Sequence, residues 1–316
     1  MSADHSSPAA GEVVRVEGLT KRWGSNTVLD GASFTISKGV TGLLGANGSG
    51  KTTFLGMVLG FHRADAGTLS VLGRDPWQAG PEVRARIGYA AEHEALPPDV
   101  RAHDFVRHVA ELHGIPKRQA IARASDALFE VGLGEERFRP LGTMSTGQKQ
   151  RVKLAQAIAH DPELVLLDEP TNGLDPMQRD QLLALVRRCG SELGLNVVLS
   201  SHLLDEVERT CDRVVIIANG VASGGGEVTD LEGDGAAVQL IVDSRPEEAA
   251  EALRNAGLQV SVDAARPLSI SCMYTDDSVY DSIASALSAA GVGIRRLDRE
   301  RRTLEDAFLE ASGGVP

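Results

Sequence analysis

The chain has 316 residues, of which 42% are hydrophobic and 24% charged, a composition that predicts a packed globular protein and excludes wholesale disorder. Its formal net charge of −12 argues against non-specific nucleic-acid binding, which needs clustered positive charge. The three cysteines, Cys189, Cys211 and Cys272, follow neither a metal-binding nor a disulfide spacing, so we expect reduced thiols that pack as small core residues.

In chain order, the first segment, residues 1–11, is polar and rich in Ser, Ala and Pro, and we expect it to be disordered. It lacks the basic and then apolar pattern of a signal peptide. No apolar run approaches the roughly 20 residues that a membrane-spanning helix needs. We therefore predict a soluble, cytoplasmic chain whose membrane role, if it has one, depends on a partner.

The next segment, residues 12–232, alternates apolar strands with amphipathic helices. Strands are predicted at 13–16, 28–36, 40–45, 67–72, 87–90, 164–168, 196–200 and 214–217. Helices are predicted at 50–59, 147–160 and 177–193, and within 98–133, where apolar residues recur at Phe105, Val106, Val109, Leu112, Ile121, Ala124 and Leu128. This alternation predicts an α/β fold with a mainly parallel sheet flanked by helices.

Two Gly-rich polar stretches, 223–226 and 232–235, predict a break, and we place a domain boundary near residue 233. The remainder, 233–316, is predicted to contain a strand (237–242), a helix (246–256), two strands (258–262 and 267–273), a helix (276–290) and a strand (293–297). This order indicates a small α+β domain of the ferredoxin-like type. A last helix is predicted at 303–310, where Thr303 and Asp306 have partial capping-box spacing.

A phosphate-binding loop is indicated at Gly45–Thr52, which matches G-x-x-x-x-G-K-[ST] between a predicted strand and a predicted helix. Its glycines allow successive backbone N–H groups to point at phosphate oxygens near a helix N-terminus. We expect Lys51 to reach the β- and γ-phosphates and the Thr52 hydroxyl to bind Mg²⁺. The residues expected to contact the nucleotide here are Asn47, Gly48, Ser49, Gly50, Lys51, Thr52 and Thr53.

Two carboxylates follow an apolar strand at the end where open α/β sheets bind ligands. Asp168 would hold the metal, largely through water, and Glu169 would polarise the attacking water. A phosphate loop alone leaves kinases, GTPases and motor ATPases open, and an Asp-Glu pair alone is often a helix start. Together the two segments predict a nucleoside triphosphatase.

The segment Ser145-Thr146-Gly147-Gln148 precedes a predicted helix, and Ser145 is suited to N-capping. With the Gln-Lys-Gln-Arg run that starts at Gln148, it resembles the signature of the ABC (ATP-binding cassette) ATPases, whose usual core is Leu-Ser-Gly-Gly-Gln. The resemblance implies that Ser145, Thr146, Gly147 and Gln148 of one subunit close over the ATP that another subunit holds.

Further segments resemble this family in the family's order. Asp175, in Gly173–Pro176, resembles the loop that crosses the dimer interface, and His202 resembles the switch histidine that contacts the γ-phosphate. Trp23 fits the aromatic platform for adenine, although a buried core tryptophan is its rival. The resemblance implies a P-loop NTPase domain with an antiparallel β subdomain and a helical subdomain, and ATP and Mg²⁺ as cofactors.

The sequence departs from the family pattern at two positions. The family normally has a glutamine near the metal, but aligning Ile87–Ala91 with the preceding strand places Glu92 there, as in some peptide and antibiotic-resistance exporters. The extra negative charge could strengthen metal coordination but also repels the γ-phosphate. Thr146 replaces the first signature glycine, which places a Cβ close to the partner's γ-phosphate.

The function implied by the resemblance is an ATPase subunit that dimerises around two ATP molecules and drives a separate membrane permease. Intact catalytic positions favour a homodimer, and residues 96–114 belong to the insertion that grips the permease in this family. The segment 299–310 resembles the tail of drug-resistance and ABC-2 exporters, so we expect export from the cytoplasmic side of the membrane. A soluble ABC ATPase acting on ribosomes or DNA is the alternative, and the C-terminal domain could also bind a regulatory ligand.

Overall fold

The structure, a computed structural model, describes residues 11–93, 95–228, 234–262 and 268–301, together with 304, 305 and 308. The chain divides into two compact units, the first running to Val228 and the second covering Thr229–Ala307. Apart from Gly11, the segment expected to be disordered at the N-terminus lies outside the described residues, as does most of the last predicted helix at 303–310.

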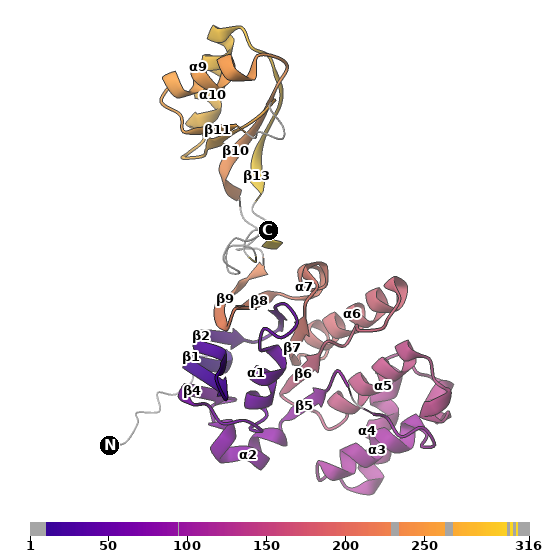
Figure 1. Ribbon diagram of the computed structural model, residues 1–316. Helices are drawn as coiled ribbons and strands as arrows, with labels where there is room; N and C mark the ends of the chain where they lie inside the picture. The colour runs from indigo at the N-terminus through magenta and orange to yellow at the C-terminus, as the bar shows by residue number, and fades with distance from the viewer. Residues whose placement is uncertain are drawn as a thin grey trace. The chain divides into compact units, whose positions relative to one another are not determined.

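A six-stranded sheet forms the centre of the first unit (Figure 1). Its strands lie in the order β5 (Ile87–Ala90), β6 (Leu164–Asp168), β7 (Asn196–Ser201), β3 (Val40–Leu44), β8 (Arg213–Ala218) and β9 (Val221–Glu227). Neighbouring strands are parallel except for β9, which pairs antiparallel with β8. Every residue of β3 and β6 is buried, which explains why both strands are continuous apolar runs in the sequence.

A three-stranded antiparallel sheet adds a second layer to the first unit. Its order is β2 (Asn26–Ser37), β1 (Glu12–Trp23) and β4 (Ala66–Val71). One apolar core joins this sheet to helix α1 (Lys51–Val58), with the rings of Phe34 and Phe54 5.2 Å apart. Helix α1 is thereby fixed between the two sheets, and its N-terminus is fixed with it.

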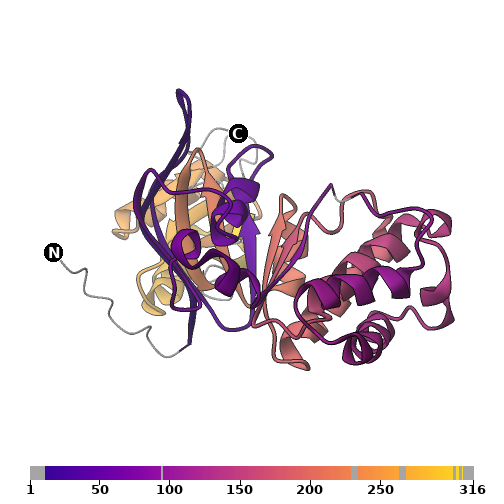
Figure 2. The same ribbon diagram turned by 90° about the horizontal axis from the view of Figure 1, so that it is seen from below.

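The third part of this unit is helical, as Figures 1 and 2 show. It contains α3 (Ala102–Leu112), α4 (Lys117–Glu130) and α5 (Thr146–Ile158), with the short 3-10 helices η1 (Glu135–Phe138) and η2 (Leu141–Thr143). The helical pattern over 98–133 is divided at Gly114, whose φ of +86° ends the first helix. Of the apolar residues that predict these helices, Val106 and Leu128 are fully buried, whereas Leu112 is 73% exposed.

Some predicted features of the first unit are wrong. The segment 223–226, where we expected a break, belongs to strand β9. Its glycines have the backbone N–H and C=O groups needed to pair with β8, although they lack the side chains that indicate a strand. Helices α2 (Pro76–Arg84) and α7 (Leu204–Thr210) were not predicted, because both are short and lack a long apolar stripe. Helix α6 (Pro176–Ser191) agrees with the prediction to within two residues at each end.

The second unit has the ferredoxin-like order that the sequence predicts. Its elements are β10 (Asp234–Val242), α9 (Pro246–Asn255), β11 (Val260–Val262), β12 (Ser269–Met273), α10 (Ser278–Ala290) and β13 (Ile294–Arg301). The sheet order is β11-β12-β10-β13, with antiparallel neighbours, and both helices contribute to one core with Val238, Leu240 and Ile270. In the described parts of both units, no helix combines the length and apolar character needed to cross a membrane.

Candidate ATP-binding and hydrolysis site

The predicted phosphate loop connects β3 to α1 and has glycines where the backbone demands them. A Cβ on Gly45 would lie 2.4 Å from the carbonyl oxygen of Ile217, so this position has no room for a side chain. Gly50 caps α1 with a φ of +113°, in the left-handed region that glycine adopts without strain. The loop therefore turns tightly at both ends and leads directly into the helix N-terminus.

Lys51, the first residue of α1, is 5% exposed and directed back into the loop. Its Nζ donates to the carbonyl oxygens of Gly45 (2.5 Å) and Ala46 (3.3 Å), and lies 3.1 Å from Oε1 of Glu169. The sequence motif places Lys51 in the loop, and the fold brings it to the predicted catalytic carboxylate. One buried cation thus connects the phosphate loop with the end of β6.

Asp168 ends β6 and is only 2% exposed. The hydroxyl of Ser200, at the end of β7, donates to Asp168 Oδ1 over 2.7 Å and accepts from the backbone N–H of Glu169 over 2.9 Å. Burial raises the pKa of Asp168, hydrogen bonds from Ser200 and Thr52 oppose that rise, and the charges of Glu92 and Glu169 add to it. Thr52 therefore meets Asp168, as expected of two residues at one metal site.

Glu169 follows Asp168 with a φ of +45°, an unusual conformation for a residue with a side chain. Its Oε2 lies 2.9 Å from Nδ1 of His202, the residue just after β7. The side chain of Glu169 is 5% exposed, whereas that of His202 is 32% exposed. The structure thus brings both predicted catalytic residues together, with His202 on the open side.

Glu92 lies two residues after β5, and its carboxylate oxygen Oε1 accepts from Nδ2 of Asn172 over 2.8 Å. Its charge acts on Asp168, which places it near the same strand ends. Thr52, Asp168 and Glu92 together present a hydroxyl and two carboxylates, the oxygen donors that a hard cation such as Mg²⁺ prefers. The residues present therefore fit a magnesium ion.

The signature segment begins α5 with a complete capping box. Ser145 Oγ accepts from the N–H of Gln148 (3.2 Å), and Gln148 Oε1 accepts from the N–H of Ser145 (3.0 Å). Gly147 is buried, and a Cβ there would lie 3.1 Å from the side chain of Gln178, whereas Thr146 is exposed. The helix N-terminus is thus ordered and presents Thr146 outwards.

Helix α6 begins beside the signature segment. Asp175 caps α6 by accepting from the N–H of Gln178 over 2.8 Å, and Gly173 lies close to the Thr146 methyl group. Figures 1 and 2 show α5 among α3 and α4, in a different part of the unit from α1. The structure therefore brings Asp175 and the signature together, and keeps both apart from the phosphate loop of the same chain.

Trp23 ends β1 and is 48% exposed, so the alternative of a buried core tryptophan is wrong. The ring of His62 meets it edge-on at 5.0 Å, and Nζ of Lys21 lies 4.6 Å from its centroid. An exposed indole held at a fixed angle offers a surface on which a base can stack.

Two residues of the site were not singled out by the sequence. Ser200 stands two residues before His202, and its hydroxyl orders both Asp168 and Glu169. Asn172 lies between Glu169 and Asp175 and holds Glu92. A polar residue at the end of a predicted apolar strand was the available signal for Ser200. Asn172 had no comparable signal, because its partner is far away in the sequence.

Comparison with known proteins places these features in one family. Residues 29–172 match the family described as ABC transporter. The linearmycin resistance ATP-binding protein LnrL of Bacillus subtilis is 32% identical over 95% of this chain and 98% of its own. The methionine import ATP-binding protein MetN of Mesorhizobium japonicum is 36% identical over 68% of this chain and 61% of its own.

A solved ATP-binding subunit of an ABC transporter has a TM-score of 0.62 with 27% identity, over 70% of this chain and 92% of its own. Its coverage agrees with the extent of the first compact unit. The phosphate loop, the paired carboxylates and the capped signature helix thus occur together on the fold of a known cassette. The chain belongs to the ABC transporter family, as one of its ATP-binding, ATP-hydrolysing subunits.

Proposed function

We propose that two copies of this chain dimerise around two ATP molecules and power export through a separate membrane permease on the cytoplasmic side of the membrane. The observation that carries this proposal is the division of the site within one chain. Lys51, Glu169 and His202 meet at the strand ends, whereas the helix that begins at Ser145 lies among other helices. A second copy can supply the missing helix end.

The roles of the side chains follow from their positions. Lys51 and the N-terminus of α1 would bind the β- and γ-phosphates, and Trp23 would stack on adenine. Glu169 would accept the proton of the attacking water, while His202, hydrogen-bonded to it, would contact the γ-phosphate.

Thr52, Asp168 and Glu92 would hold Mg²⁺, which neutralises charge on the phosphates when it is bound. Across the dimer, the exposed start of α5 would meet the γ-phosphate with the positive end of its helix dipole. The hydroxyl of the exposed Thr146 would add a hydrogen-bond donor there, in place of the family's glycine.

Export, rather than import, is supported by the share of this chain that each relative matches. The similarity to the linearmycin resistance protein spans both compact units, whereas the similarity to the methionine import protein covers 68% of this chain. The ferredoxin-like unit is thus shared in sequence with a resistance protein. We assign this chain to the same kind of transporter, with the permease on another polypeptide.

Dimerisation can be tested by light scattering of the full chain. We expect the Glu169→Gln variant to bind ATP without hydrolysing it, so with Mg²⁺ and ATP it should form a dimer, and without ATP a monomer. Adding Thr146→Asp should keep it monomeric, because a carboxylate would face the partner's γ-phosphate. Ser285→Asp, an equal charge change at an exposed position of helix α10, should leave the dimer intact. A dimer that forms equally well with Thr146→Asp would refute the proposed interface.

The permease can be tested by co-purification in detergent with a candidate membrane protein from the same genome. A stoichiometric complex whose ATP hydrolysis responds to transported compounds supports export. ATP hydrolysis that needs no membrane protein but requires ribosomes or nucleic acid would instead support the soluble alternative.

A further inference from the structure

One face of α5 binds the backbone of β5, the edge strand of the six-stranded sheet. Gln156 Nε2 donates to the carbonyl oxygen of Tyr89 over 2.7 Å, and His160 Nε2 lies 3.2 Å from the carbonyl oxygen of Ile87. The approach is close, because a Cβ on Gly88 would lie 1.8 Å from the carbonyl oxygen of Ala157. Gln156 of α5, and His160 just after the end of the helix, thus bind carbonyl groups of β5.

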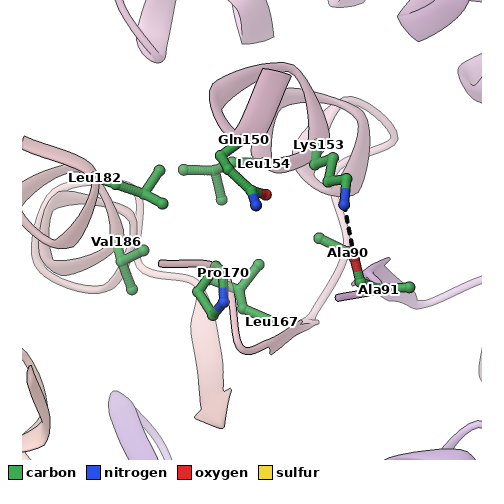
Figure 3. A pocket seen from close by; sticks show the side chains of 9 residues that line it. All are labelled: Ala90, Ala91, Gln150, Lys153, Leu154, Leu167, Pro170, Leu182 and Val186. Carbon is green, nitrogen blue, oxygen red and sulfur yellow. Dashed lines mark hydrogen bonds between the residues drawn. The ribbon is translucent and has the colours of Figure 1, made fainter. Parts of the chain in front are cut away.

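Lys153, one turn before Gln156 on the same face, extends this contact past the end of β5. Its Nζ donates to the carbonyl oxygens of Ala91 (3.0 Å) and Glu92 (2.9 Å), and the first of these bonds is drawn in Figure 3. The residue is only 6% exposed. The cavity beside it has a volume of about 10 Å³, room for no more than one water, so the bonds are shielded from solvent and correspondingly strong.

Glu92 is consequently held at two points. Lys153 binds its carbonyl oxygen, and Asn172 binds its carboxylate. Asn172 is itself fixed, because its backbone N–H donates to the carbonyl oxygen of Glu169 over 3.2 Å. The backbone of Glu92 is thus bound to α5, while its side chain is bound to the loop after β6.

We propose that Lys153 is a positioning residue that holds the backbone of Glu92, and with it the Glu92 carboxylate, and so links the metal side of the site to the signature helix. This inference rests on the proposed function, which assigns Mg²⁺ to Glu92 and Asp168. Helix α5 has Ser145 at its N-terminus and Lys153 two turns later, so displacement of the signature also displaces Glu92. The signature of one subunit and the metal side of its own site then move together.

The test measures how much Mg²⁺ improves the affinity of the full chain for a fluorescent ATP analogue, a readout that needs neither hydrolysis nor a permease. Lys153→Met keeps the length of the side chain but removes the donor. We expect affinity without Mg²⁺ to stay unchanged and the improvement due to Mg²⁺ to fall roughly 10-fold, as for other residues that orient a metal ligand. Gln156→Met, which removes a bond to β5 but none to Glu92, is the matched control and should keep the improvement.

A double variant separates positioning from a general effect on packing. Glu92→Ala, which removes the carboxylate, should lower the Mg²⁺ improvement, and adding Lys153→Met should change it little further, because both act through one carboxylate. Additive losses, or equal losses in Lys153→Met and Gln156→Met, would overturn the proposal. If Lys153→Met does not fold, Lys153→Leu, which also removes the donor, takes its place and should show the same loss. A wild-type chain that binds ATP without any response to Mg²⁺ would refute the metal site itself, and the inference with it.

Discussion

Ser200 and Asp168 are register partners on the parallel strands β7 and β6, and the Ser200 hydroxyl donates to the Asp168 carboxylate. The same hydroxyl accepts from the N–H of Glu169. One buried serine therefore orders the predicted metal ligand and the predicted catalytic base. The positions of these two carboxylates depend on how adjacent strands are aligned, as well as on the strand that carries them.

Replacing this serine should weaken both the fold and the site. Ser200→Ala removes a donor from Asp168 and leaves the N–H of Glu169 without its acceptor, so we expect a loss of about 1–3 kcal/mol in unfolding free energy. Urea denaturation monitored by circular dichroism measures it. Ser191→Ala, at the exposed end of α6, should change stability by less than about 0.5 kcal/mol. Equal effects would show that the Ser200 bonds contribute nothing specific.

The role of Glu169 predicts a separation of binding from turnover. Glu169→Gln keeps the size of the side chain but removes its basicity, so kcat should fall at least about 100-fold while ATP affinity is retained. Phosphate release measures turnover, and nucleotide titration measures affinity. Glu163→Gln, at a half-exposed glutamate that pairs with Arg86, is the control and should hydrolyse ATP normally. A Glu169→Gln variant near wild-type turnover would contradict the assignment.

The fold was largely predictable because most of its signals are local. The bounds of β5 and β6 agree with prediction, since apolar runs and flanking polar residues define them. The strand at 221–227 was missed because its glycines resemble a linker, and it is held by pairing with β8. Within the site, the phosphate loop and the two carboxylates after β6 were indicated by the sequence pattern, whereas His202 and Glu92 were indicated by the family resemblance. Ser200 and Lys153 were not, because their partners are set by strand register and helix packing.

Stability should depend on pH through His160. Burial lowers its pKa to about 4, and the charge of His113, stacked on it at 3.7 Å between ring centroids, contributes. The ring is therefore neutral in the fold and donates from Nε2 to the carbonyl of Ile87. Because an unfolded histidine titrates near pH 6.5, the unfolded chain binds more protons between pH 6.5 and 4, and stability falls as pH falls.

We expect this residue to account for a loss of about 1 kcal/mol between pH 7 and 5, allowing for its partial exposure to solvent. Urea unfolding at both pH values measures it. His160→Gln retains a donor near Ile87 but does not titrate, so its stability should vary less with pH. An unchanged pH dependence in that variant would rule out His160 as the source.

The cysteines should be inert in the folded protein. All three are buried, and burial raises the pKa of Cys189 and of Cys272 to about 11 and that of Cys211 still further. Because the thiolate is the reactive form, a thiol reagent at pH 8 should label the native chain slowly. In urea, where the chain is unfolded, the same reagent should label all three cysteines quickly. Rapid labelling of one cysteine without denaturant would reveal local opening around it.

The contact between α5 and β5 also bears on how the protein behaves at high concentration. An edge strand with free carbonyls can pair with strands of other molecules and start aggregation. Here Gln156 and His160 bind carbonyl groups of β5, and Lys153 binds those just after it, so this edge of the parallel sheet offers little to an incoming strand. Variants that shorten these side chains should be checked for self-association on storage, because the side chains also keep β5 from pairing with strands of other molecules.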